Sequence, residues 1–252
     1  MTAETRIPGS ELPLYEVPGW RNRFGVSAGI TGRGDGPEPF DLGLWSSGPV
    51  GETMQRWRRF RRADPLFPAQ VMSHQVHGDV VMWHDPLPAG WTIHEAADGH
   101  ATAAAGVLLM VTVADCVPIY LVAPAHGAIA LLHSGWRGTA AGILQRGVAL
   151  LAARTGATPG ELVMHTGVAI SGPRYEVGRE VIEGVGLPPH GAGPWHLDIR
   201  ELLGRQARAL GIGEVTTSPH CSAEPGGPFF SHRGSGGADG RMVAWLGLIP
   251  RD

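Results

Sequence analysis

The stretch Val107-Leu-Leu-Met-Val-Thr-Val113-Ala-Asp-Cys116-Val-Pro118 contains an apolar run that ends just before a cysteine. A second apolar run, residues 128–132, ends at His133. Both runs are short and continuous, which is typical of strands buried inside a sheet. A cysteine and a histidine at the ends of two such strands can face each other. Cys116 and His133 are therefore the first candidate functional residues.

A third candidate ligand, His77, lies upstream in His74-Gln-Val-His77-Gly78. Two imidazoles and one thiolate suit a zinc ion that keeps one coordination position open, as catalytic zinc does. Two other interpretations fit the same residues. Cys116 and His133 can act as a nucleophile and its base, or both can be structural, as a small core residue and a hydrogen-bonded histidine at the rim. The spacing matches no compact zinc-finger pattern.

Around these strands, apolar periodicity predicts a mixed succession of strands and helices, with no sequence repeat. We expect strands at residues 22–30, 70–76, 79–83, 107–114, 118–122, 128–132, 162–170, 229–232 and 242–248. We expect helices at residues 52–63, 139–153, 176–184 and 198–210, the second capped by Thr139 and the last capped by Asp198 and ended by Gly211. This succession is typical of an α+β (mixed α/β) fold. We expect an extended lead-in at residues 1–20 and a single domain at 21–252.

Composition limits the class of protein. With 252 residues, of which 43% are hydrophobic, the chain can bury one sizeable core. A formal net charge of −3 argues against a nucleic-acid partner. The basic cluster at residues 56–62 fits one helix with an apolar stripe and a solvated arginine face. The N-terminal residues lack the apolar core of a signal peptide, and no apolar run spans a bilayer, so we expect a cytoplasmic protein without a membrane partner.

All twenty basic residues are arginine, so the chain contains no lysine. This composition excludes a Schiff-base lysine, lysine-bound pyridoxal phosphate and a P-loop lysine. Anions must then be bound by arginine, backbone amides, helix ends or a metal. Only two cysteines are present, Cys116 and Cys221, which is no disulfide framework. We expect Cys221 to be structural.

The segment after His133 is a candidate anion site. Arg137 lies beside the backbone amides of Gly138 and Thr139, which we expect to open a helix, and such an arrangement can bind phosphate. Arg233 is a candidate second anion contact. The competing interpretation of Arg137 is a turn that packs Trp136 and leaves the guanidinium in solvent. Asp115 points away from Cys116 if both lie on a strand, so we expect it to orient a neighbouring loop.

Five blocks in this order carry a family resemblance: Gln75-Val-His77-Gly78, Ala114-Asp-Cys116-Val-Pro118, His133-Ser-Gly-Trp-Arg-Gly-Thr139, Ile170-Ser-Gly-Pro-Arg-Tyr175-Glu-Val-Gly178 and Phe229-Phe-Ser-His-Arg233. Over residues 24–248 the chain resembles the laccase-domain family, also called multicopper polyphenol oxidase and, more recently, purine nucleoside phosphorylase. It departs from the usual family residues at four positions: Ser134 for Ala, Arg174 for Cys, Ser222 for Thr, and His232 for Tyr.

The resemblance implies helices layered around mixed sheets, with room for an internal structural duplication. It also implies a zinc-dependent phosphorylase of purine nucleosides (adenosine, inosine, guanosine and methylthioadenosine) that deaminates adenosine. The substrates would be small purine nucleosides and phosphate. His77, Cys116 and His133 would hold the metal, while Cys116, His133 and Arg137 would carry the chemistry.

Three other functions stay open at this point. The first is a cysteine hydrolase or amidase that uses Cys116 and His133. The second is a copper-linked polyphenol oxidase, although twelve histidines without any His-x-His pair favour one transition metal over an array of coppers. The third is a non-catalytic protein that binds a metal or a purine.

Overall fold

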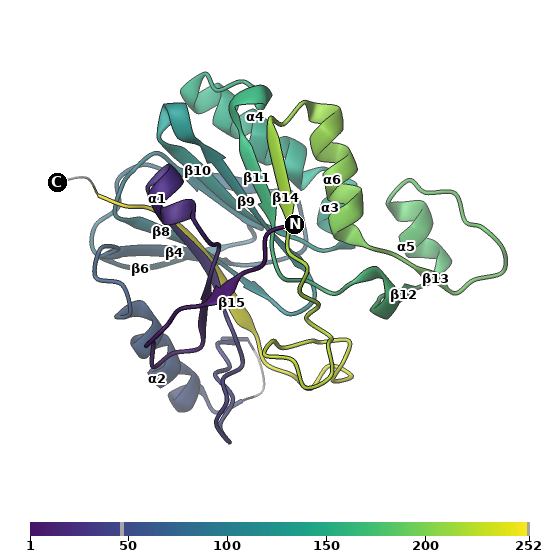
Figure 1. The fold of residues 1–252 in the computed structure, drawn as a ribbon, viewed down its shortest axis with the longest axis horizontal. Helices are drawn as coiled ribbons and strands as arrows, with labels where there is room; N and C mark the ends of the chain where they lie inside the picture. Colours follow the sequence, from purple (N-terminus) through teal and green to yellow (C-terminus); the bar gives the residue numbers. More distant parts are fainter. Residues whose placement is uncertain (46–47, 251–252) are drawn as a thin grey trace.

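The computed structural model describes residues 1–45 and 48–250 and has four layers (Figure 1). Two sheets pack face to face in the middle, and helices cover the two outer faces. The α+β single-domain fold expected from the sequence is confirmed, whereas the bounds of the lead-in (1–20) and of the domain (21–252) stay predictions. The internal duplication stays a prediction.

The first sheet contains seven strands within the described residues. In spatial order they are β1 (Thr5–Arg6), β2 (Leu14–Glu16), β3 (Val26–Thr31), β15 (Met242–Leu248), β8 (Val107–Val113), β4 (Ala69–His74) and β6 (Gly90–Glu95). The outer face of this sheet is covered by α2 (Val50–Arg61), whose Trp57 and Phe60 are buried against it. The short helix α1 (Trp20–Phe24) precedes β3.

The second sheet contains six strands within the described residues. In spatial order they are β14 (Glu214–Thr217), β11 (Val163–Thr166), β9 (Val117–Ala123), β10 (Ala128–Ser134), β7 (Gly99–Thr102) and β5 (Val81–His84). The outer face of this sheet packs against α4 (Ile143–Thr155) and α6 (Ile199–Leu210). A small sheet is formed by β12 (Glu176–Val177) and β13 (Trp195–His196), and α5 (Arg179–Gly184) lies beside it (Figure 1). The helix α3 (Trp136–Ala141) contacts α4, α5, α6 and the strand β10.

The continuous apolar runs form strands because both of their faces are buried. In β9, Ile119 and Leu121 contact the helices, whereas Tyr120 and Val122 enter the core between the sheets. β8 alternates in the same way between the two sides of its sheet. A strand with two buried faces carries no polar alternation, and this explains the pattern seen in the sequence.

Several predicted boundaries differ from the structure. Residues 22–30 do not form one strand, because α1 ends at Gly25, a glycine with a φ of 66°, before β3 begins. The helix predicted at 139–153 is two helices, because Gly142 takes a φ of 86° that ends α3. Residues 229–232 form no strand, although Phe229 is buried between the two sheets. By contrast, Asp198 and Gly211 cap α6 as predicted.

Candidate metal centre and the cavity beside it

His77, Cys116 and His133 lie together at one end of the two sheets. Their candidate ligand atoms are all within 4.8 Å of one another. Among residues 1–45 and 48–250, no other set of three His, Cys, Asp or Glu side chains meets this criterion. His133 is buried, Cys116 is half-buried and His77 is exposed, so the cluster has one side open to solvent.

The strand pairing brings Cys116 next to His133. β9 and β10 are antiparallel, with Pro118 opposite His133, so the residue just before β9 meets the end of β10. Gly135 completes the fit. A Cβ atom at this position would lie 3.0 Å from the Cys116 Sγ and 3.2 Å from the Cδ2 of His77. Only glycine allows the backbone to approach these two side chains so closely.

Asp98 organises the two histidines. Its carboxylate accepts hydrogen bonds from the backbone N–H groups of Val76, His77 and Gly78, at 3.1, 2.9 and 2.7 Å. The Nδ1 atom of His133 lies 2.8 Å from the same carboxylate. A histidine that donates from Nδ1 presents Nε2 as its free ligand atom, and a carboxylate behind a histidine is common at metal sites.

Sequence reasoning missed Asp98. The only local signal is its place before a strand, in Ala97-Asp98-Gly99. Its partners come from the turn after β4 and from the end of β10. No short sequence window contains this arrangement.

The charges at the centre favour the thiolate. Burial alone would raise the pKa of Cys116, but the adjacent His133 and His77 outweigh burial and lower it to about 6. Burial alone would lower the pKa of His133, but Cys116 and Asp98 outweigh burial and raise it to about 9. In the metal-free protein the pair is therefore a thiolate beside an imidazolium, and the thiolate is the form of cysteine that binds metals or attacks carbonyls.

Asp115 orients neighbouring loops, as the sequence indicated. Its carboxylate accepts hydrogen bonds from the Ser222 hydroxyl at 2.7 Å and from the backbone N–H of Arg233 at 2.6 Å. Its carbonyl oxygen accepts the N–H of Ile170 at 3.1 Å. Asp115 has a φ of 85°, in the left-handed region that residues other than glycine seldom adopt. These contacts hold the backbone that leads into Cys116.

A cavity of about 410 Å³ opens beside the three candidate ligands. This volume suits a nucleoside-sized molecule. Its walls combine aromatic rings with arginines and with the three candidate ligands. Besides those ligands, they include Trp45, His74, Trp136, Arg137, Tyr175, His232, Arg233 and Arg241.

Arg137 and Arg233, the two predicted anion contacts, both line this cavity. The Arg137 guanidinium stacks 4.4 Å from the ring centroid of Trp136, and its side chain is exposed. The Arg233 guanidinium lies 5.1 Å from the ring centroid of Tyr175, and its Nη1 donates to the Glu176 carbonyl at 2.5 Å. Two positive charges therefore lie on the wall of the cavity.

The helix that carries Gly138 and Thr139 begins earlier than the sequence predicts. The helix begins at Trp136 after Gly135, so Thr139 is inside it and does not cap it. The backbone N–H and the hydroxyl of Thr139 both donate to the Gly135 carbonyl, at 2.9 and 2.8 Å, so neither is free for phosphate. Gly138 packs against the Gly78 carbonyl, which a Cβ atom would approach to 2.9 Å.

The remaining residues that the sequence singled out lie outside the cluster of His77, Cys116 and His133. Cys221 lies outside the cluster, where its Sγ accepts hydrogen bonds from the backbone N–H and the hydroxyl of Ser171 at 3.3 and 3.1 Å. Arg174 forms an exposed ion pair with Glu224 at 3.7 Å. Of the four departures from the family residues, His232 alone lines the cavity.

A two-sheet α+β domain with one His–Cys–His cluster beside a nucleoside-sized cavity agrees with the comparisons to known proteins. A family model described as multi-copper polyphenol oxidoreductase laccase matches residues 24–249. The chain belongs to this family.

Two of its relatives carry the name purine nucleoside phosphorylase. Purine nucleoside phosphorylase YlmD of Geobacillus stearothermophilus is 34% identical over 249 residues, covering 88% of this chain and 90% of the relative. Purine nucleoside phosphorylase of Deinococcus radiodurans is 35% identical over 187 residues, covering 71% and 70%. The crystal structure of YlmD from Geobacillus stearothermophilus matches with a TM-score of 0.87 and 30% identity, over 99% of this chain and 100% of that one. No helix in the described part of this chain is both long and apolar enough to span a membrane.

Proposed function

We propose that this chain is a zinc-dependent purine nucleoside phosphorylase that also deaminates adenosine. Its substrates would be adenosine, inosine, guanosine and methylthioadenosine, with phosphate as the second substrate. One observation carries the proposal: the ligand atoms of His77, Cys116 and His133 lie within 4.8 Å of one another on the wall of the cavity. The names of the relatives support the activity.

The donor set fits zinc. One thiolate and two imidazoles are ligands that zinc accepts, and three protein ligands leave a position for water or substrate. Asp98 adds the carboxylate that holds His133 in a single orientation. When bound, zinc supplies Lewis-acid chemistry and lowers the pKa of a coordinated water to about 7. Copper(I) also accepts thiolate and imidazole ligands and is the second metal to test.

The chain's own residues then take three roles. Arg137 and Arg233 bind phosphate through their guanidinium groups. Trp136 and Tyr175 support those guanidinium groups by ring contact and exclude water from the same wall. Asp98 and Asp115 hold the backbone around His77 and Cys116, so that the three ligand side chains stay converged. Thr139 contributes to packing, because its N–H and hydroxyl both bond to Gly135. The backbone N–H of Gly138 stays a candidate phosphate contact.

A cysteine hydrolase or amidase is the second candidate. The low pKa of Cys116 and the high pKa of its partner His133 favour it, because an activated thiolate beside an imidazolium is the usual nucleophile pair. Metal separates the two candidates. A phosphorylase of the proposed kind loses activity on chelation and regains it with zinc, whereas the hydrolase keeps full activity.

Product analysis tests the proposal. Adenosine is incubated with the zinc-loaded protein, with and without phosphate, and metal content is measured by mass spectrometry. Adenine and ribose 1-phosphate formed only with phosphate, together with one zinc per chain, support phosphorolysis, and inosine formed in both reactions supports deamination. Absence of turnover by a zinc-loaded, folded protein contradicts the proposal and favours a binding protein. Stoichiometric copper with oxygen uptake on a phenol favours an oxidase.

A further inference from the structure

We propose that Glu4 is a positioning residue for the candidate metal centre. Its carboxylate joins two segments, residues 165–171 and residues 218–222, and both segments hold Asp115, which precedes Cys116 in the chain. The inference rests on the proposed function in taking Cys116 as a metal ligand. Glu4 lies in residues 1–20, for which the sequence predicts only an extended lead-in.

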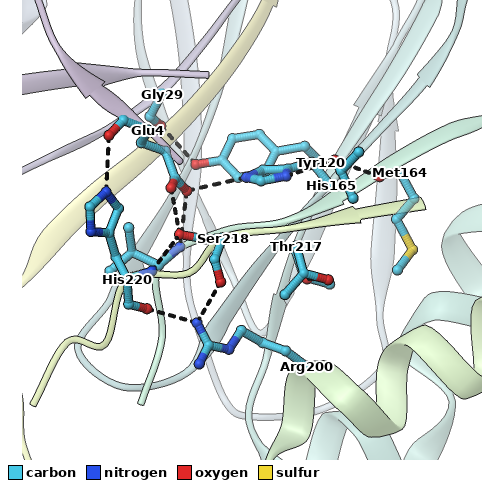
Figure 2. Close-up of polar contacts among 12 residues, drawn as sticks. Glu4, Gly29, Tyr120, Met164, His165, Arg200, Thr217, Ser218 and His220 are labelled. Atoms are coloured by element: carbon cyan, nitrogen blue, oxygen red, sulfur yellow. Dashed lines mark hydrogen bonds and ion pairs between the residues drawn. The ribbon is translucent and has the colours of Figure 1, made fainter. Parts of the chain in front are cut away.

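The Glu4 side chain is buried between the two segments (Figure 2). Its Oε1 accepts the backbone N–H of Val168 at 3.1 Å and lies 3.2 Å from the Nε2 of His165. Its Oε2 accepts the Ser218 hydroxyl at 2.5 Å. Burial would raise the pKa of Glu4, but hydrogen bonds from His165 and Ser218 outweigh burial and lower it. A buried carboxylate thus carries its charge and uses both oxygens to connect the segments.

The backbone around Glu4 strengthens the same connection. The Glu4 carbonyl oxygen lies 3.0 Å from the Nε2 of His220, which is placed to donate to it. From the opposite side, the Nη1 of Arg200 donates to the carbonyl oxygens of Ser218 and His220, at 2.9 and 2.7 Å. Figure 2 shows Ser218 and His220 between Glu4 and Arg200. This part of segment 218–222 is therefore fixed from two sides.

Each of the two segments forms a hydrogen bond with Asp115. In segment 165–171, the N–H of Ile170 donates to the Asp115 carbonyl at 3.1 Å. In segment 218–222, the Ser222 hydroxyl donates to the Asp115 carboxylate at 2.7 Å. The segments also join each other, because the Ser222 N–H donates to the Ala169 carbonyl at 3.0 Å. The left-handed backbone of Asp115 persists only while such contacts hold it.

The three candidate ligands are thus held by two buried carboxylates. Asp98 holds His77 and His133 through direct hydrogen bonds. Glu4 acts on Cys116 at a distance, through the segments that fix Asp115. Because metal affinity depends on how accurately ligands converge, a change at Glu4 should be measurable at the centre. The same path reaches Arg233, whose backbone N–H donates to Asp115.

The test compares Glu4→Gln and Ser218→Ala with the control Glu16→Gln, which changes a carboxylate on β2 outside this network. Two quantities are measured: the zinc dissociation constant, by competition with a chromophoric chelator, and the alkylation rate of Cys116 in the metal-free protein, by peptide mass spectrometry. Partners behind metal ligands typically contribute about 10- to 100-fold, so this more distant one should contribute about three- to tenfold. We expect weaker zinc binding and a changed alkylation rate in both network variants and neither effect in Glu16→Gln.

A double-mutant cycle separates positioning from general loss of stability. Ser222 is one of the two contacts through which the segments reach Asp115, and Ile170 is the other. Glu4→Gln should therefore weaken zinc binding less in a Ser222→Ala background than in the unaltered protein. Additive effects in the cycle would overturn the proposal, as would unchanged zinc affinity and Cys116 alkylation in a folded Glu4→Gln protein. If Glu4→Gln does not fold, Ser218→Ala decides by the same two measurements. It removes the hydroxyl that donates to Glu4 and accepts the His220 N–H. If the unaltered protein binds no zinc, the proposed function fails, and the alkylation rates still decide the positioning role.

Discussion

The Nδ1 atom of His133 and the Oδ1 atom of Asp98 lie 2.8 Å apart, and both side chains are buried. The same carboxylate accepts three backbone N–H groups of the turn that carries His77. One aspartate therefore fixes two of the three candidate ligands relative to each other. This relationship makes Asp98 the residue whose replacement should most directly affect metal binding.

Replacing Asp98 by Asn should weaken zinc binding by about 10- to 100-fold, the usual effect of removing a carboxylate behind a ligating histidine. The asparagine amide is uncharged, so it no longer stabilises the proton that His133 donates from Nδ1. Its single oxygen also cannot accept all three backbone N–H groups of the turn that carries His77. The matched control is Asp79→Asn, because Asp79 lies in the loop that carries His77 but pairs with Arg146 at the surface. Chelator competition measures both. Equal affinity in Asp98→Asn and the unaltered protein would contradict the assignment.

Replacing Cys116 by Ser should abolish metal binding and activity together, because a serine hydroxyl stays protonated at neutral pH and is a poor zinc ligand. Cys221→Ala should retain metal and most of the activity, since the Cys221 sulfur accepts a hydrogen bond from the Ser171 hydroxyl and lies outside the cluster. Metal content and turnover are measured on the same samples. A Cys116→Ser protein that keeps zinc but loses turnover would instead favour the nucleophile mechanism.

Replacing Arg137 by Ala should raise the KM for phosphate by about tenfold or more, because a hydrogen bond to a charged group contributes about 1.5–3 kcal/mol. Deamination needs no phosphate and should change less. Arg146→Ala is the control, since Arg146 is an exposed arginine of α4 that pairs with Asp79. Steady-state kinetics of both reactions provide the comparison. Equal losses in the two reactions, with zinc unchanged, would assign Arg137 to the loop or the nucleoside.

Acid should destabilise the fold partly through two buried histidines. His84 and His100 share a 2.9 Å hydrogen bond, and the ring of His94 stacks on His84. Burial, reinforced by the neighbouring imidazoles, lowers the pKa of His84 to about 4 and that of His100 to about 3. The folded chain thus keeps both neutral, while the unfolded chain protonates them near pH 6.5. Their contribution to stability is complete above that pH and is lost as the pH falls towards 4.

Between pH 6 and 4, the unfolded chain binds up to one more proton at each of these histidines than the folded chain does. Each histidine should therefore add up to about 1.4 kcal/mol per pH unit to the slope of the unfolding free energy against pH. Urea unfolding at several pH values measures the slope, and His84→Asn should reduce it. The exposed His190, replaced by Asn, is the control and should leave the slope unchanged. Ring resonances of His100 that titrate near pH 6.5 in the folded protein would disprove this account.

The elements that could be predicted from sequence are those with a strong local pattern. The sequence predicts β8 and β10 because their apolar runs fill two buried faces, and it predicts α6 because Asp198 and Gly211 mark its ends. Predictions were wrong where one glycine changed the backbone. Gly142 ends α3 and separates it from α4, and nothing in the apolar pattern of residues 139–153 marks the break.

By itself, the sequence determined the chemistry available to this protein. It has no lysine, one cysteine after a buried strand, histidines at suitable strand ends, and enough apolar residues for one core. The tertiary structure decided which of these groups meet. Asp98, Asp115 and Glu4 act through hydrogen bonds to residues distant in the chain, and strand register and turn geometry place those partners. Local periodicity encodes burial, but it carries no information about which distant backbone groups a buried carboxylate will bind.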